Sequence, residues 1–368
     1  MRLAVHVPKF LFFDRQRDFL GYAFAFFKKY RPILYFPSLK RSLLGGRGFE
    51  QLIRSKAGED TVDLVYSMRE LNRRADVLIS FNDFPYLPER QPPRKFQGLK
   101  VWHVMDYVFR PREACEALTT GGVDTIMGYA DHGRYCPFFR EFYAPFVDRL
   151  IPVPFGFGDR FKRNTPFPDR IPKAIALGSV NPVDDPQARS REDLADYIRF
   201  FRDHTWTHRW RRALVEHRET LAPVMDSQLP VFPETKNPEY DAVEMLNRYA
   251  FFPNDEGLMQ FPPARTYEGM AAGALLVGND HPCYRDIGLR DGVNCVLHPS
   301  RDVTAFRERL EALRNSPAEA ERLAEAGYRH VRKHFSHQAV AEHIHRQVAA
   351  RYAGKPAPQP AYQQPTDA

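Results

Sequence analysis

Arginine and glutamate side chains between Tyr249 and Val296 have a spacing that could bind an anionic ligand. Arg265 and Glu268 are three residues apart and Ala272 follows four later, so all three share one face of a predicted helix. Glycines and alanines around them permit close approach to the backbone. The start of such a helix exposes free N–H groups and the positive end of its dipole, which favour phosphate.

Strands and turns on either side of this helix must hold it in place. Pro262 and Pro263 suit its first turn. Gly273 suits the position just after its end. Apolar runs at 250–252 and 275–277 predict a short strand before and after it.

Polar residues with acid–base chemistry follow two predicted strands in the first half of the chain. His103 and Asp106 lie at or beyond the carboxyl end of a strand over 98–105, and His132 follows a strand over 123–128. In open α/β sheets, ligands bind outside the carboxyl ends of the strands. These three residues are therefore the candidate catalytic groups, and the alternative is two core histidines and a helix-capping aspartate.

Composition limits the class of protein. A length of 368 residues favours two domains, and 53 basic against 46 acidic residues give a net charge of +7. The basic residues are spread along the chain without a nucleic-acid-binding motif, so they indicate a phosphorylated substrate, a membrane surface or a plain solvated exterior. Four cysteines lack C-x-x-C spacing, which argues against a zinc site and fits a reducing cytosol: Cys115, Cys136, Cys283 and Cys295.

Strands and helices alternate along the chain, which predicts an α/β fold. A proline-rich stretch at 164–172 marks the boundary between two domains. Helices are expected over 19–30 and 61–74, among others. We expect an N-terminal domain over 1–160, a C-terminal domain over 161–352 and a disordered, low-complexity tail over 353–368.

The helix motif resembles the donor-binding segment of GT-B glycosyltransferases, with the pattern R-x-x-E-x-x-A-x-G-x-x-x-V. Its five defined positions are occupied by Arg265, Glu268, Ala271, Gly273 and Val277. The variant looks closest to the branch with spore-maturation and polysaccharide-biosynthesis transferases. The resemblance is specific over residues 173–350 and topological over 1–160.

The resemblance assigns roles to particular residues. Glu268 would accept hydrogen bonds from the ribose hydroxyls of a nucleotide-sugar. Many relatives carry a second glutamate eight residues upstream, where this chain has Gln260, and Asp255 or Glu256 is the expected substitute. The loop after the first strand of the second domain, with a nearby basic residue, would meet the donor diphosphate. The implied donor-binding residues are Gly178, Ser179, Arg189, Arg191, Asp255, Glu256, Gly257, Gln260, Arg265 and Glu268.

The implied fold is two Rossmann-like domains facing across a cleft, with the last helix crossing back to the first domain. The implied reaction is transfer of a sugar, such as a hexose, from an NDP-sugar to a hydroxyl of a saccharide, a lipid-linked molecule or another acceptor in polysaccharide or glycoconjugate synthesis. The NDP-sugar is the co-substrate, and we expect neither metal nor cofactor, since no D-x-D occurs. For an inverting reaction, Asp106 or His103 would be the general base.

Two other functions fit the same sequence features. One is an NDP-sugar epimerase on this fold, and the other is a degenerate GT-B domain that binds without turnover. We expect a cytoplasmic protein with peripheral contact to the membrane and no nucleic-acid partner. No apolar run approaches the length of a membrane span.

Overall fold

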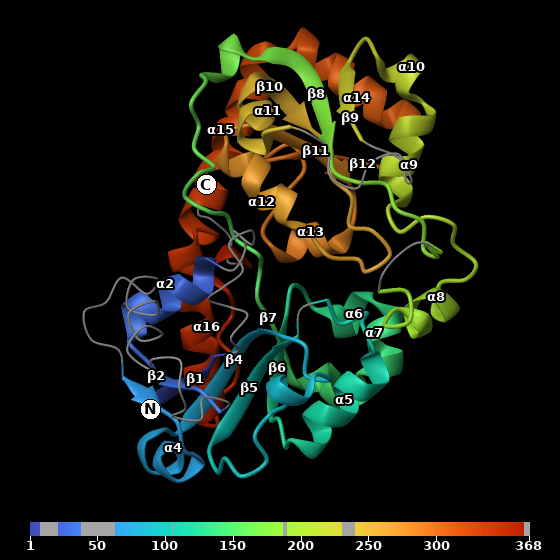
Figure 1. Ribbon diagram of the computed structural model, residues 1–368. Helices are drawn as coiled ribbons and strands as arrows, with labels where there is room; N and C mark the ends of the chain where they lie inside the picture. The colour runs from blue at the N-terminus through green and yellow to red at the C-terminus, as the bar shows by residue number, and fades with distance from the viewer. Residues whose placement is uncertain (8–20, 38–62, 105, 187–189, 230–239, 364–368) are drawn as a thin grey trace. The chain divides into compact units, whose positions relative to one another are not determined.

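The computed structural model describes residues 1–7, 21–37, 63–104, 106–186, 190–229 and 240–363 (Figure 1). The chain divides into two compact units. Unit 1 contains Met1–Val153 and His337–Pro358, and unit 2 contains Pro154–Ser336 and Gln359–Ala368.

Unit 1 is built on a parallel sheet. Within the described residues, seven strands pair in the order β3-β2-β1-β4-β5-β6-β7. Such strands are apolar along their whole length when helices cover both faces of the sheet, as the buried start of β4 illustrates. The strands are β1 (Leu3–His6), β2 (Ile33–Tyr35), β3 (Leu64–Val65), β4 (Val77–Asp83), β5 (Leu99–Val104), β6 (Thr125–Gly128) and β7 (Leu150–Pro152). The helices before β7 include α2 (Gly21–Tyr30), α4 (Met68–Arg74), α5 (Pro111–Thr120), α6 (His132–Tyr135) and α7 (Pro137–Phe142).

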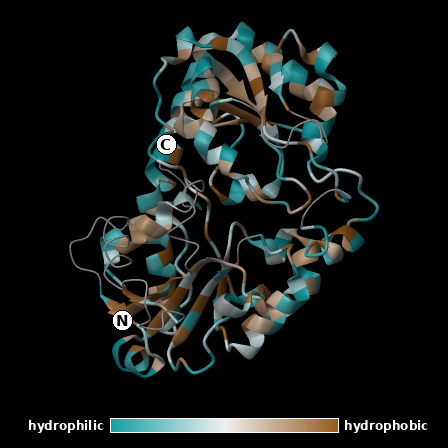
Figure 2. Ribbon diagram, viewed as in Figure 1, coloured by the Kyte–Doolittle hydropathy of each residue, from teal (hydrophilic) through white to brown (hydrophobic). Residues whose placement is uncertain are grey.

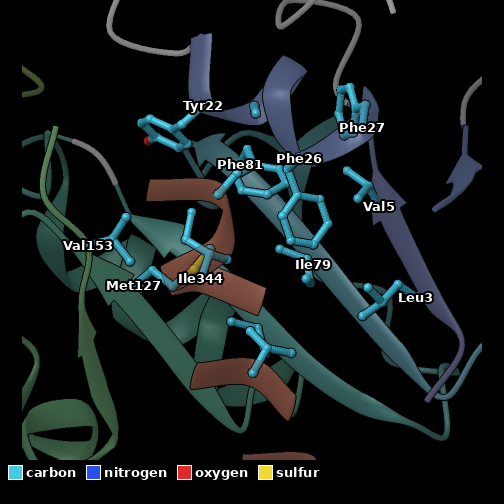
Figure 3. Close-up of a cluster of buried hydrophobic side chains, with 14 of the residues drawn as sticks. Leu3, Val5, Tyr22, Phe26, Phe27, Ile79, Phe81, Met127, Val153 and Ile344 are labelled. Carbon is cyan, nitrogen blue, oxygen red and sulfur yellow. The ribbon is translucent and has the colours of Figure 1, made fainter. Parts of the chain in front are cut away.

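The last helix of the chain, α16 (His337–Tyr352), packs within unit 1. Ile344 and Val348 belong to the same buried cluster as Phe26 of α2 and the apolar residues of β1 and β4 (Figure 3). At the surface, Lys29 forms an ion pair with Glu342. The predicted return of the last helix to the first domain is therefore confirmed.

Unit 2 holds a second parallel sheet. In the part of the chain that the structure describes, its five strands pair in the order β12-β11-β10-β8-β9. Figure 2 shows apolar strands flanked by helices with hydrophilic surfaces. The strands are β8 (Ile171–Leu177), β9 (Met225–Gln228), β10 (Tyr249–Phe252), β11 (Leu275–Asn279) and β12 (Val296–His298). The helices include α8 (Ala195–Phe200), α9 (Arg209–Glu216), α10 (Arg218–Leu221), α11 (Ala242–Arg248), α12 (Ala264–Ala271), α13 (Pro282–Asp286), α14 (Val303–Asn315) and α15 (Pro317–His334).

The strand order of unit 2 defines its ligand-binding edge. β8 lies between β9 and β10, so the chain leaves β8 toward one side of the sheet and leaves β10 toward the other. At such a switch point the loops after the two strands part and leave a crevice beyond their carboxyl ends. Both sheets have the Rossmann-like organisation that the sequence predicts.

Two expected elements differ in the structure. The helix expected over 61–74 begins only at Met68, because Ser67 accepts a hydrogen bond from the Glu70 N–H and caps it, and β3 precedes it. The tail expected to be disordered from residue 353 forms a 3-10 helix at Ala361–Gln363, because Tyr362 is buried against Phe335.

Candidate functional site

Several of the predicted donor-binding residues lie at the switch point of unit 2. Gly178 and Ser179 directly follow β8, and Asp255 and Glu256 lie in the loop after β10. Helices α9, α12 and α13 add further polar side chains. We call the following residues the switch-point cluster: Gly178, Ser179, His208, Arg211, Asp255, Glu256, Arg265, Glu268 and Tyr284.

Asp255 organises this cluster from inside. Its carboxylate is buried and accepts hydrogen bonds from the Arg211 N–H at 3.0 Å and the Gly257 N–H at 2.7 Å. The first of these bonds satisfies a free N–H group in the first turn of α9, where His208 provides no side-chain cap. Asp255 therefore joins the loop after β10 to the start of α9.

Arg211 places a partly buried cation beside the loop after β8. Its guanidinium donates to the Ser179 carbonyl oxygen at 3.3 Å. Gly178 has a φ of +121°, which favours glycine, and a Cβ there would lie 2.8 Å from Arg211 Nη1, so a larger residue would displace the guanidinium. Burial lowers the pKa of Arg211, the Asp255 carboxylate raises it and Arg265 lowers it, which places both charges close by.

Arg265 and Glu268 share one face of α12, as the spacing predicts. Arg265 Nη1 lies 3.2 Å from Glu268 Oε2, and the two side chains are 22% and 14% exposed. Both groups are thus sheltered but reachable, which distinguishes this pair from an ordinary surface ion pair.

Three buried polar atoms in the switch-point cluster form no hydrogen bond. Among the described residues, these are His208 Nδ1, Tyr284 Oη and Arg265 Nη1, the last of which keeps its ion pair with Glu268. His208 Nδ1 lies 3.9 Å from Asp255 Oδ2, and burial, followed by the Arg211 charge, lowers the pKa of His208 to about 3. Native proteins rarely leave such groups unsatisfied, so their convergence points to a polar ligand.

Glu256 is the second carboxylate of the loop. It accepts a hydrogen bond from Asn279 Nδ2 at 3.0 Å, and Asn279 Oδ1 in turn accepts from the Arg301 N–H. Burial, together with the Asp255 carboxylate, raises the pKa of Glu256 to about 7. Glu256 is therefore partly protonated at neutral pH.

The raised pKa of Glu256 predicts a pH-dependent stability. Between pH 4.5 and 7 the folded state holds a proton that the unfolded chain has released, so stability falls as pH rises through this window. We expect Glu256→Gln, which keeps the acceptor for Asn279, to raise the melting temperature above wild type at pH 8 and to match it near pH 4.5. Melting curves from pH 4.5 to 8.5 test this, and a constant difference would contradict it.

The remaining predicted donor residues lie as follows. Gly257 has a φ of +61° and packs against the His208 ring, and Gln260 has a φ of +56° in the turn before α12. Arg191 forms an exposed ion pair with Asp184 at 2.8 Å, and its predicted role toward the diphosphate stays a prediction. Arg189 lies outside the described residues.

The three candidate catalytic residues of the first half differ in their exposure to solvent. His103 is fully buried, with Nδ1 3.1 Å from Tyr22 Oη. His132 is also buried, and its Nε2 accepts from the Tyr129 N–H at 3.1 Å, which leaves the Nδ1 proton for Tyr107 Oη. Burial lowers both pKa values to about 3. Asp106 alone is exposed, with a φ of +48° just after β5.

Sequence reasoning did not assign His208, Arg211, Tyr284 and Asn279 to the site. Only the basic run from Arg209 to Arg212 gave a signal, and it did not indicate which arginine lies in the cluster. Among the described residues, no group of three or more His, Cys, Asp or Glu is placed to hold a metal ion, and metal-free chemistry stays a prediction. In the same residues, no helix combines the length and apolarity that crossing a membrane requires.

Comparison with known proteins bears on this arrangement. Residues 232–346 match a family described as glycosyl transferase-like. No curated protein matches the chain in sequence. The structure is similar to HepE of Anabaena in complex with UDP, with a TM-score of 0.52, 9% identity and coverage of 95% of this chain and 100% of HepE. It is also similar to a glycosyltransferase from Rickettsia africae, with a TM-score of 0.52, 10% identity and coverage of 96% and 98%.

Two Rossmann-like units with parallel sheets, and these structural similarities, define the GT-B fold. Five of the nine residues of the switch-point cluster, from Asp255 to Tyr284, lie within the part of the chain that matches the glycosyl transferase-like family, and the other four precede it. The protein therefore has the GT-B fold, and residues 232–346 form a glycosyl transferase-like domain.

Proposed function

We propose that the protein transfers a sugar from a nucleoside diphosphate sugar, bound at the switch-point cluster, to a hydroxyl group of a saccharide acceptor. The observation that carries this proposal is the convergence of Arg211 and Arg265 with two buried polar atoms that form no hydrogen bond, His208 Nδ1 and Tyr284 Oη, at the switch point of the unit 2 sheet. HepE has been crystallised with UDP and with UDP-glucose, which favours a uridine nucleotide as the first donor to test.

The charges of the cluster suit a diphosphate leaving group. When the acceptor oxygen bonds to the anomeric carbon, the bond from that carbon to the diphosphate oxygen breaks, and the electron pair stays on the diphosphate. Arg211 and Arg265 would stabilise this negative charge in a sheltered site, where electrostatic effects are strong. Glu268 would accept hydrogen bonds from the ribose hydroxyls.

The proposed acceptor-side base is Asp106. In an inverting reaction the acceptor hydroxyl must give up its proton, and an exposed carboxylate at the carboxyl end of a strand can take it. Asp106 meets that description, whereas His103 and His132 are closed inside the core of unit 1. We therefore propose Asp106 alone for this role.

The NDP-sugar epimerase alternative is not favoured, because residues 232–346 match a glycosyl transferase-like family. A degenerate domain without turnover would still bind the donor. Release of the nucleoside diphosphate in the presence of acceptor separates that alternative from an active enzyme.

We also propose that the acceptor is a polysaccharide or lipid-linked saccharide handled in the cytoplasm near the membrane. A net charge of +7 supports contact with an anionic surface. The cysteines at 115, 136, 283 and 295 are free thiols, as a reducing compartment favours.

Glu268→Ala tests the donor site. Hydrogen bonds to a charged acceptor are worth about 1.5–3 kcal/mol, so UDP affinity should fall on the order of 10- to 100-fold. Isothermal titration with UDP, GDP and their sugars measures this affinity. The affinity of Glu268→Gln should lie between those of wild type and Glu268→Ala. Glu319→Ala is the matched control, since Glu319 pairs with Arg322 at the same spacing on the exposed side of α15. An unchanged affinity in folded Glu268→Ala would remove α12 from the donor site.

A further inference from the structure

The C-terminal end of the described chain belongs to unit 2, although α16 before it belongs to unit 1. Residues 353–358, which follow α16, still belong to unit 1, and the chain returns to unit 2 at Gln359. There Ala361–Gln363 forms a 3-10 helix whose central side chain, Tyr362, is 7% exposed. A low-complexity sequence gives no sign of this docking.

Tyr362 packs behind the helices that carry donor-site residues. Its ring centroid lies 5.0 Å from that of Phe335, at the end of α15. Phe335 lies 5.0 Å from the ring of Tyr267 on α12, and Tyr362 is near enough to Tyr267 to raise its pKa along with burial. Tyr267 is fully buried, while Arg265 and Glu268 of the same helix are partly exposed. Tyr362 thus supports α12 from its buried side.

The same segment holds the end of α13. Gln363 Nε2 donates to the carbonyl oxygen of Asp286, the last residue of α13, at 2.8 Å. The Tyr362 carbonyl oxygen lies only 2.2 Å from the position that a Cβ on Gly288 would occupy, and Gly288 has a φ of +79°. α13 carries Tyr284, one of the unpartnered groups of the switch-point cluster.

We infer that Gln359–Gln363 is a positioning segment of the donor site, which fixes α12 and α13 so that Arg265, Glu268 and Tyr284 converge on the nucleoside diphosphate. This inference rests on the proposed function. The segment touches no donor atom and acts through the two helices. A ligand-binding element held from behind in this way loses affinity when its support is removed, even while the domain stays folded.

The test compares UDP affinity with stability in the full-length protein. We expect Tyr362→Ala to weaken UDP binding on the order of 10-fold, by isothermal titration at a temperature well below its melting point. Tyr362→Phe keeps the ring and should restore affinity to within about 2-fold of wild type. A chain ending at residue 358 should lose affinity like Tyr362→Ala, and a chain ending at 363 should match wild type.

Leu313→Ala separates positioning from general destabilisation. Leu313 lies in the main core cluster of unit 2, which contains no residue of α12, α13 or the C-terminal segment. The Leu313→Ala substitution should lower the melting temperature yet leave UDP affinity unchanged. Hydrogen exchange in α13 should become faster in Tyr362→Ala and not in Leu313→Ala. If wild type binds UDP and folded Tyr362→Ala binds it equally well, the inference is wrong while the proposed function stands. If Leu313→Ala weakens binding as much, the inference is also wrong. Failure of wild type to bind any nucleoside diphosphate would overturn both.

Discussion

Replacing Arg170 with methionine is expected to lower the free energy of unfolding by about 3–5 kcal/mol, because several buried hydrogen bonds from a charged donor, each worth about 1.5–3 kcal/mol, are lost. Arg170 is 4% exposed. Its guanidinium donates to the carbonyl oxygens of Leu246 at 2.8 Å, of Ala272 at 2.7 Å and of Thr165 at 2.9 Å. Methionine fills much of the space but leaves these carbonyls without a donor.

The location of these carbonyls explains why the loss should be large. Leu246 lies in the last turn of α11 and Ala272 at the end of α12, where carbonyl groups lack partners and the helix dipole is negative. One arginine therefore caps both helices and ties them to the start of β8. Burial lowers the pKa of Arg170 to about 10, so the cation persists at neutral pH.

Urea unfolding of Arg170→Met and Arg170→Lys measures this effect. Lysine retains the charge with fewer directed donors and should give an intermediate loss. Arg307→Met is the control, because Arg307 forms an exposed ion pair with Glu311 at 2.8 Å and should cost less than about 1 kcal/mol. If Arg170→Met lowers the free energy of unfolding no more than Arg307→Met does, the three carbonyl oxygens must be hydrogen-bonded to water in the variant.

Arg211→Met is expected to weaken binding of UDP or a UDP-sugar on the order of 30- to 4000-fold, since removing one partner of a buried charge pair costs about 2–5 kcal/mol. The effect should exceed that of Glu268→Ala, because a phosphate charge in a sheltered site would be left without its cation. The Arg211 N–H still donates to Asp255, so the start of α9 should stay intact.

Arg212→Met is the matched control for Arg211→Met. Arg212 is the next residue on α9, but it pairs with Glu216 at 2.8 Å and lies over the Trp206 ring. Isothermal titration of both variants should show a loss for Arg211→Met only. Equal affinities for Arg211→Met and wild type would mean that the diphosphate binds elsewhere, and equal losses would indicate a general effect of positive charge.

Local sequence patterns determined the elements of this protein and part of its site. The R-x-x-E spacing defined the face of α12 that carries Arg265 and Glu268, because residues three apart on a helix are neighbours in any tertiary setting. Apolar runs predicted β10 and β11 on either side of α12, and the prolines and glycine at 262, 263 and 273 predicted where that helix begins and ends. Strand, loop and helix signals are encoded within a few residues of one another.

Only the tertiary structure decided which distant residues meet. Arg211 joins Gly178 and Asp255 because β8 and β10 are neighbours in the sheet, and that order depends on packing over the whole unit. The same is true of Arg170, which caps two helices from another part of the chain. His103 is a core residue because the strands and helices of unit 1 cover it. Tyr362 lies in a stretch without apolar periodicity, yet it is buried because it packs against Phe335 and close to Gly288. A residue's type and local spacing specify what its side chain can do, whereas burial and long-range partners arise only when the sheets and helices assemble.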